Sequence, residues 1–266
     1  MRQPMEKQSV KLIQSVQRSI DILNCFTDAS PRLSLNEISQ RVDLNINTTR
    51  GLINTLTANG LLIHDKTNNI YSLGFYFMGK ANVIQKQVES YITMSKGLVD
   101  AIANKYHISA SLQMVNQNQI YSIYCAYPIN TAYYIILSEY SVLPKYATSS
   151  GKLLMLYNLY DNDESAFDNL EFKQFTPRTI MDAETLKANL EEVRRNKYAC
   201  ELEEFALGVG SMAVPIFDLS NQLIATVSAT FFVHSLPAIK DSLLTDLKNI
   251  AATVSDNFCN IQKNKA

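Results

Sequence analysis

The chain has 266 residues, more than one domain usually holds, so two domains are expected. Its formal charge is −1, but residues 1–80 carry nine Lys/Arg against six Asp/Glu, and the remainder carries 15 against 19. A mildly basic front half fits DNA binding at that end. The four cysteines are far apart without a CxxC pair, which argues against a disulfide framework or a zinc site.

The beginning of the chain carries no apolar leader segment, and no apolar run approaches the ~18 residues of a membrane span. We therefore expect a cytoplasmic protein with no membrane partner. No internal repeat or low-complexity tract is present.

The N-terminal segment has the pattern of a helix-turn-helix followed by a hairpin. Ser34-Leu35-Asn36-Glu37 has the S-x-x-E form of a capping box, Asn45 can cap the next helix, and Gly60 is placed to end it. The expected elements are helices over 15–26, 35–42 and 46–59 and strands over 61–63 and 70–73. A helix of major-groove size, braced by another and followed by a hairpin, is what a winged helix-turn-helix needs.

The rest of the chain predicts a linker helix followed by an α+β domain. No proline interrupts residues 75–90, and the apolar period changes from 3.6 to 2 after Tyr106. The expected helices are 92–106, 148–159, 183–196 and 241–261, and the expected strands are 109–115, 119–125, 133–137, 198–201, 211–217 and 223–232. This order favours an antiparallel sheet with flanking helices.

Two polar features of this domain suggest a ligand. Thr148 and the residues after it open a helix, where free backbone N–H groups favour an anion, although an ordinary N-cap would look the same. Thr226, Ser228 and Thr230 share one face of a strand, with Val227 on the other. Such hydroxyls can simply be solvated, but if that face is buried, a polar ligand or trapped water is the simplest explanation.

In this order, the segments resemble the IclR family of bacterial transcription regulators over nearly the whole chain. The resemblance rests on residues 15–23, 33–38, 52–56, 60–62, 71–74, 147–154 and, most specifically, on 198–211 with 213–218. It implies a winged helix-turn-helix over 10–74, a linker helix over 75–91 and a GAF-like effector-binding domain over 92–262. It also implies a dimer or tetramer, a palindromic double-stranded DNA operator and a small effector, often an organic acid. No cofactor is expected.

The DNA-facing residues are expected on the second helix of the helix-turn-helix. Asn47, Thr48, Arg50 and Asn54 are the candidates for the groove, because Arg suits guanine and Asn suits adenine. Arg18, Ser34 and Lys66 are the candidates for phosphate contacts. The family commonly has a basic residue where this chain has Gly51. More of the base readout is therefore expected from Asn47, Arg50 and Asn54.

The resemblance also implies the lining of the effector pocket. The matching positions are Ser149, Ser150, Glu201, Ser211, Ser228 and Thr230. Tyr133, Ile135, Leu143 and Val209 are candidates for apolar lining or core. Glu203 and Glu204 are expected to be surface or structural residues and not ligand contacts. Two positions depart from the family pattern: Glu201 stands where aspartate is usual, and Ser211 where many members have cysteine.

The sequence leaves two other functions to consider. An enzyme is disfavoured because His64, His107 and His234 are scattered and no nucleophile elbow, P-loop or GxGxxG occurs, so no catalytic or metal residue is assigned. The other alternative is a DNA-binding regulator whose C-terminal domain only oligomerises.

Overall fold

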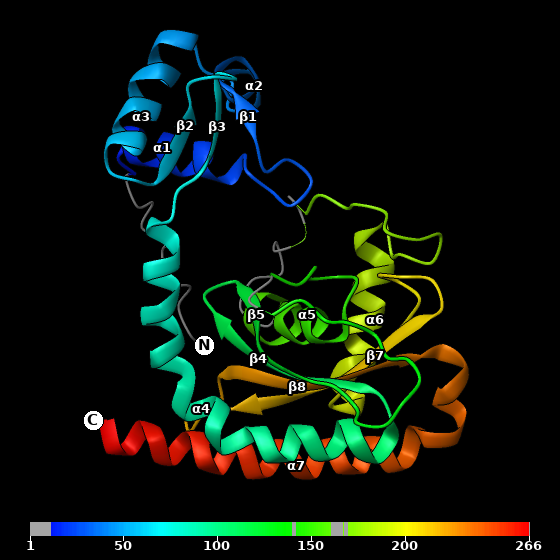
Figure 1. Cartoon of the computed structure of the whole chain (residues 1–266). Coiled ribbons are helices and arrows are strands. Elements are labelled where there is room, and N and C mark those ends of the chain that lie inside the picture. Colours follow the sequence, from blue (N-terminus) through cyan, green and yellow to red (C-terminus); the bar gives the residue numbers. More distant parts are fainter. Residues whose placement is uncertain (1–11, 140–141, 161–166, 168–169, 266) are drawn as a thin grey trace, which may run out of the picture. The chain divides into compact units, whose positions relative to one another are not determined.

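The computed structural model describes residues 12–139, 142–160, 167 and 170–265 (Figure 1). Contacts divide the chain into two compact units, residues 1–87 and 88–266. Residues 10 and 11, the first of the predicted DNA-binding domain, lie outside the described residues.

Residues 12–74 of the first unit form three helices and a small antiparallel sheet. The elements are α1 (Gln14–Asn24), β1 (Leu33–Ser34), α2 (Leu35–Arg41), α3 (Ile46–Ala58), β2 (Leu62–Asp65) and β3 (Ile70–Leu73), with strand order β1-β3-β2. The predicted capping box is present, because Ser34 Oγ accepts from the Glu37 N–H and the Glu37 carboxylate accepts from the Ser34 N–H. Asn45 Oδ1 caps α3 by accepting from the Thr48 N–H at 2.9 Å.

Two glycines bring the end of α3 and the end of β3 together. Gly60 follows α3 with φ +72°, a left-handed conformation that favours glycine. Gly74 lies so close to this turn that an added Cβ would be 1.9 Å from the Gly60 carbonyl oxygen. The Gly74 N–H donates to the Leu61 carbonyl at 2.8 Å, so the close approach closes the hairpin onto the helix.

A single continuous helix, α4 (Tyr76–Tyr106), replaces the two helices expected over 75–90 and 92–106. Residues 88–92 contain neither proline nor glycine, so nothing in the chain interrupts the helical hydrogen bonds there. The division between the two units falls inside this helix, between residues 87 and 88.

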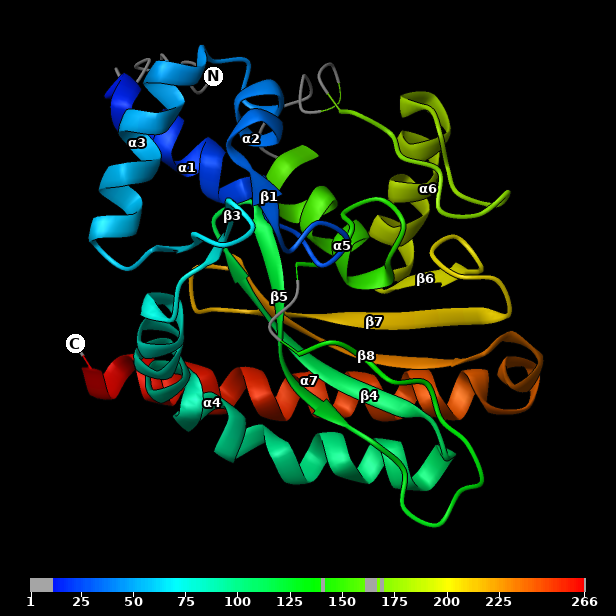
Figure 2. The same ribbon diagram turned by 45° about the horizontal axis from the view of Figure 1, so that its top comes forward.

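The second unit is a five-stranded antiparallel sheet covered by helices on both faces. Its elements are the rest of α4, β4 (Ser109–Asn116), β5 (Gln119–Ala126), α5 (Ser149–Leu154), the π-helix η1 (Met155–Tyr160), α6 (Ala183–Asn196), β6 (Ala199–Leu202), β7 (Val209–Phe217), β8 (Leu223–Phe232), the 3₁₀-helix η3 (Val233–Ser235) and α7 (Leu236–Lys265). The strand order is β5-β4-β8-β7-β6. α4 and α7 cover one face, and α5 and α6 cover the other (Figure 2).

The predicted strand over residues 133–137 is wrong. These residues form no strand, and Tyr133 and Ile136 are largely exposed. Side chains bind this backbone in place of a neighbouring strand: Ser109 Oγ donates to the Ile135 carbonyl, and the Tyr127 hydroxyl donates to the Leu137 carbonyl. The apolar alternation that suggested a strand therefore belongs to an irregular loop.

Two helices also differ from their predicted bounds. The helix expected over 148–159 is six α-helical residues followed by a π-helix. The last helix begins at Leu236, five residues earlier than predicted, with Pro237 in its first turn, where no hydrogen bond from its nitrogen is needed.

Candidate functional site

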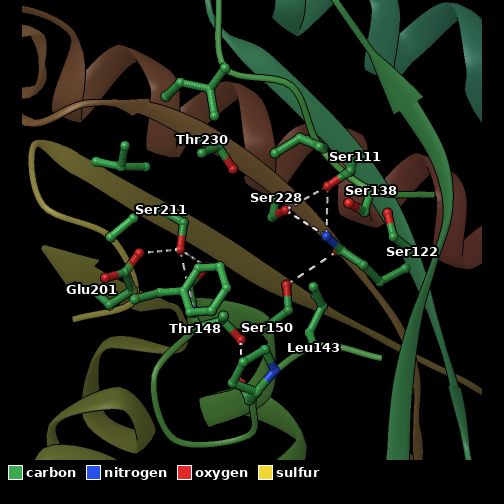
Figure 3. A pocket seen from close by; sticks show the side chains of 18 of the residues that line it. Ser111, Ser122, Ser138, Leu143, Thr148, Ser150, Glu201, Ser211, Ser228 and Thr230 are labelled. Atoms are coloured by element: carbon green, nitrogen blue, oxygen red, sulfur yellow. Dashed lines mark hydrogen bonds between the residues drawn. The ribbon is translucent and has the colours of Figure 1, made fainter. Parts of the chain in front are cut away.

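The second unit holds a cavity of about 540 Å³, lined by residues of the sheet and of α5 (Figure 3). Its polar lining is Ser111, Gln113, Ser122, Ser138, Thr148, Ser149, Ser150, Glu201, Ser211, Ser228 and Thr230. All six positions that the resemblance implied therefore lie on one cavity. None of the described residues that line it is a lysine, arginine or histidine.

Polar side chains on β4 and β8 form one wall of this cavity. The strands are antiparallel, with Ser111 opposite Ser228 and Gln113 opposite Thr226. Their neighbours Ala110, Leu112, Val227 and Ala229 point the other way, into the core under α4 and α7. Because successive side chains of a strand alternate between faces, each strand separates a polar wall from an apolar core.

The β4 half of this wall was not predicted from the sequence. Ser109-Ala110-Ser111-Leu112-Gln113 has the same alternation of polar and small or apolar residues as the segment from Thr226 to Thr230. That signal was available, but only the pairing of β4 with β8 turns two separate stripes into one surface.

Gln113 is the centre of the hydrogen bonds on this wall. Its side chain is buried, with 3% of the residue exposed. The amide nitrogen donates to Ser111 Oγ at 2.6 Å and to Ser228 Oγ at 2.8 Å. The amide oxygen accepts from Thr226 Oγ1 at 2.7 Å and from Ser150 Oγ at 3.2 Å. One carboxamide thus connects β4, β8 and α5.

Glu201 is the ionisable group of the cavity lining. It is 3% exposed, and its carboxylate accepts from Ser211 Oγ at 2.9 Å and from the Glu204 N–H at 3.0 Å. Burial raises the pKa of Glu201 to about 7, because a charge is costly away from water, and these two hydrogen bonds oppose the rise. Glu201 therefore changes charge near neutral pH.

The start of α5 uses most of its donors within the protein. Ser149 donates to Ser211 Oγ with both its N–H, at 3.3 Å, and its hydroxyl, at 2.9 Å. Thr148 Oγ1 accepts from the Gly151 N–H and donates to the Pro144 carbonyl. A Cβ on Gly151 would lie 2.3 Å from that carbonyl oxygen, so only glycine lets the preceding loop approach the helix. α5 thus positions the cavity lining and presents few free N–H groups.

A buried ion pair lies next to Glu201. Lys152 is fully buried, and its Nζ is 2.5 Å from Glu204 Oε1. Glu204 Oε2 has no hydrogen-bond partner among the described residues. Glu204 is thus half of a buried ion pair, and Glu203 pairs with Arg178 at 3.0 Å. The burial of Lys152 could not be predicted from the local sequence, because it depends on contacts with distant segments such as the one that carries Glu204.

The apolar part of the lining comes mainly from the loop before α5 and the loop between β6 and β7. Its residues are Ile135, Ile136, Leu137, Val142, Leu143, Pro144, Phe175, Phe205, Ala206 and Val209. Ile135, Leu143 and Val209 were candidates for this role. Tyr133, also a candidate, lies elsewhere: it is 65% exposed, with its ring 5.5 Å from that of Phe232.

In the first unit, the candidates for the groove lie on α3. Asn47, Arg50 and Asn54 are exposed, and Thr48 is half-buried. Arg50 Nη1 donates to Asn47 Oδ1 at 3.2 Å, so these two side chains form one polar group. The opposite side of α3, with Thr49, Ile53 and Leu56, is buried in the core.

The three candidates for phosphate contacts differ in their exposure and in the hydrogen bonds that they already make. Lys66 is exposed in the turn between β2 and β3, and Arg18 is half-buried on α1. The Ser34 hydroxyl donates to Glu37 Oε2 at 2.7 Å, so its hydrogen is already used in the capping box. Ser34 is therefore the least available of the three for a phosphate.

Within the described parts of the chain, no three His, Cys, Asp or Glu side chains are grouped so that they could hold a metal ion. No helix there has the length and apolar character needed to cross a membrane.

Two family models match the chain. The IclR helix-turn-helix domain matches residues 15–66, and the bacterial transcriptional regulator IclR C-terminal domain matches residues 87–256. Among curated relatives, the transcriptional regulator XynR of Escherichia coli K12 is 25% identical over 218 residues, which cover 82% of this chain and 85% of XynR. The repressor AllR of Salmonella paratyphi A is 27% identical over 84% of this chain and 81% of its own length.

Solved structures share the fold. An IclR transcriptional regulator from Silicibacter sp. TM1040 superposes with a TM-score of 0.80 at 20% identity, covering 92% of this chain and 96% of that one. An IclR homolog from Microbacterium hydrocarbonoxydans, in complex with 4-hydroxybenzoate, has a TM-score of 0.68 at 16% identity, covering 91% and 98%. The chain belongs to the IclR family of DNA-binding bacterial transcriptional regulators.

Proposed function

We propose that a small organic or hydroxy acid, bound in the cavity of the second unit, controls the binding of this regulator to its operator. The observation that carries the proposal is the cavity itself, because it combines a volume of about 540 Å³ with buried polar groups on several walls. Ligand pockets typically have volumes of ~300–1,000 Å³ and a few convergent polar groups.

The polar groups divide into two ends. One end is the wall of β4 and β8 around Gln113, with Ser150, Ser228 and Thr230. The other end is Glu201 with Ser211. A hydroxy acid has two different polar groups, and the two ends offer a place for each. The complex of the Microbacterium homolog with 4-hydroxybenzoate, a hydroxy acid bound within the same fold, supports this class of ligand.

Control of DNA binding requires that the ligand bind two states of the protein with different affinity. α4 contributes residues to both units, so it is the element through which a change in one can reach the other. We expect the change to alter the spacing between two half-sites of a palindromic operator.

Self-association is part of this proposal, because a palindrome needs two DNA-binding units. Exposed apolar side chains in the first unit support it: Leu12, Ile13, Val16 and Ile20 lie in or next to α1, and Phe75, Met78, Val83 and Ile84 lie in or next to the first half of α4. Exposed apolar surface of this kind is typical of protein–protein contacts. A dimer or tetramer follows as the expected assembly.

The proposal is tested with the double variant Ser228→Ala/Thr230→Ala. A thermal shift screen with small organic acids first identifies compounds that stabilise the wild type, because only a state that binds ligand is stabilised. Operator binding with and without each compound is then measured for both proteins. We expect the double variant to bind the operator normally and to lose the response.

The matched control is Ser242→Ala/Thr253→Ala, which removes two exposed hydroxyls that bind carbonyls of their own helix, α7. A full response in the Ser228/Thr230 variant would refute this site. If no compound stabilises the wild type, the alternative in which the second unit only oligomerises is favoured.

A further inference from the structure

We propose that Gln113 determines which ligand group the wall of β4 and β8 accepts, and that this group is a hydrogen-bond acceptor such as a carboxylate. The proposal rests on the function proposed above and adds a specificity-determining residue to it. It follows from counting the hydrogens on the wall.

The two hydroxyls that accept from the Gln113 amide nitrogen keep one hydroxyl hydrogen free between them. The amide has two N–H hydrogens, and it donates one to Ser111 Oγ and one to Ser228 Oγ. These two hydroxyls are 3.0 Å apart, so one donates to the other. Each hydroxyl has one hydrogen, and therefore one of the pair still has its hydrogen without an acceptor among the described residues.

The two hydroxyls that donate to the Gln113 amide oxygen leave no hydrogen free. Gln113 Oε1 accepts from Thr226 Oγ1 and from Ser150 Oγ, and these two hydroxyls are themselves 3.0 Å apart. However their hydrogens are arranged, both are used among these three groups. Thr226 Oγ1 is nearer to Gln113 Oε1, at 2.7 Å, than to Ser150 Oγ, at 3.0 Å, so both hydroxyls donate to the amide oxygen and leave it no free position for a donor of the ligand.

The wall consequently presents a donor, and Gln113 fixes where it is. Ser111 and Ser228 line the cavity, and so does Thr230. A ligand carboxylate accepts from such hydroxyls and donates nothing, which matches the wall. A carboxamide also brings two hydrogens, for which Gln113 has no free acceptor, so only hydroxyl oxygens such as that of Thr230 remain to accept them.

The carboxylate is also expected at this wall because of the charge at the opposite end. Glu201 is the acidic residue of the lining, and a ligand carboxylate beside it would place two like charges in one cavity. The ligand hydroxyl belongs at that end, where it can donate to Glu201. Gln113 thus sets the orientation of a hydroxy acid in the cavity.

The experiment compares acids with their own amides on the full-length protein. The probes are lactate with lactamide, glycolate with glycolamide, and 4-hydroxybenzoate with 4-hydroxybenzamide, each titrated by calorimetry at pH 8. In the wild type we expect at least one acid to bind about tenfold or more tightly than its amide, because a hydrogen bond to a charged group is stronger than one to a neutral group.

Two substitutions of Gln113 make the test specific. In the variant Gln113→Glu the carboxylate has the same shape as the amide but only accepts hydrogen bonds. It therefore takes up the free hydroxyl hydrogen and adds a negative charge. We expect the acid to lose at least tenfold in affinity and the preference to turn toward the amide. Gln113→Met removes the carboxamide at nearly constant length, and the ratio of the two affinities should fall to within about threefold of one. The control Gln117→Glu makes the same change in charge at an exposed position of the turn after β4.

The outcomes separate the inference from the function on which it rests. A role of Gln113 in folding alone would lower both affinities and keep their ratio, and that result would overturn the inference. Equal binding of acid and amide by the wild type would overturn it as well, while the effector site would stand. If no probe binds the wild type, the hydroxy-acid proposal itself fails.

Discussion

The buried ion pair of Lys152 and Glu204 is expected to be essential for the stability of the second unit. Substituting Lys152 by methionine keeps the length of the side chain and removes its charge. Lys152 is fully buried, and Glu204 Oε1 is 2.5 Å from its Nζ. The variant would leave the Glu204 carboxylate buried without a counter-charge, because its other oxygen already has no partner among the described residues. Breaking such a pair costs about 3–5 kcal/mol.

Urea unfolding of the full-length protein at pH 7, followed by circular dichroism, measures this loss. The double variant Lys152→Met/Glu204→Met removes both charges and should recover most of the stability, because apolar residues of similar volume often replace a buried pair without loss. The control Lys105→Met breaks a pair with Asp246 in which the lysine side chain is 59% exposed, and it should destabilise the protein much less, because solvent screens an exposed pair. The reasoning is refuted if Lys152→Met costs no more than this control, or if the double variant is as unstable as the single one.

Three further predictions concern the cavity and the DNA-binding unit. Burial raises the pKa of Glu201 from 4.5 to about 7, so between these pH values the native state keeps a proton that the unfolded chain has lost. The contribution of Glu201 to the unfolding free energy should therefore fall by about 3 kcal/mol as the pH rises from 4.5 to 7. Urea titrations from pH 4.5 to 8 should show this part of the slope in the wild type and not in Glu201→Gln; parallel curves would contradict it. Arg50→Ala should weaken binding to the operator far more than binding to random DNA, whereas an equal loss on both would exclude base readout by Arg50. Gly51 is exposed, and a Cβ there would meet nothing within 4 Å. Gly51→Ala should therefore stabilise the first unit against thermal unfolding by about 1 kcal/mol. A lower midpoint of thermal unfolding in the variant would show that the glycine is needed.

The three helices and the hairpin of the first unit could be read from the sequence because their signals are local, whereas β1 was not predicted because it exists only through its pairing with the distant β3. The capping box at Ser34 and the cap at Asn45 each involve residues three positions apart, and both are present in the structure. The exposed positions of Asn47 and Arg50 follow from the helical period in the same way. The approach of Gly74 to Gly60 was not predictable, because it joins two chain segments that only the folded hairpin brings together.

Local patterns were also the source of the errors. The apolar alternation in residues 133–137 is typical of a strand, but a strand needs a partner with free backbone groups, and here side chains bind that backbone. The break expected near residue 91 had no helix-breaking residue to cause it, and α4 continues through.

The sequence by itself determined the two-part architecture, the capped helices and the hydroxyl stripe on β8, because each depends on neighbours along the chain. The cavity around them was decided only by the tertiary structure. Pairing of β4 with β8 sets Gln113 among four hydroxyls, and the burial of Glu201 and Lys152 depends on segments that are distant in the chain. Hydrogen-bond partners and burial of a side chain are properties of the packed fold, so they appear only when the strands and helices are assembled.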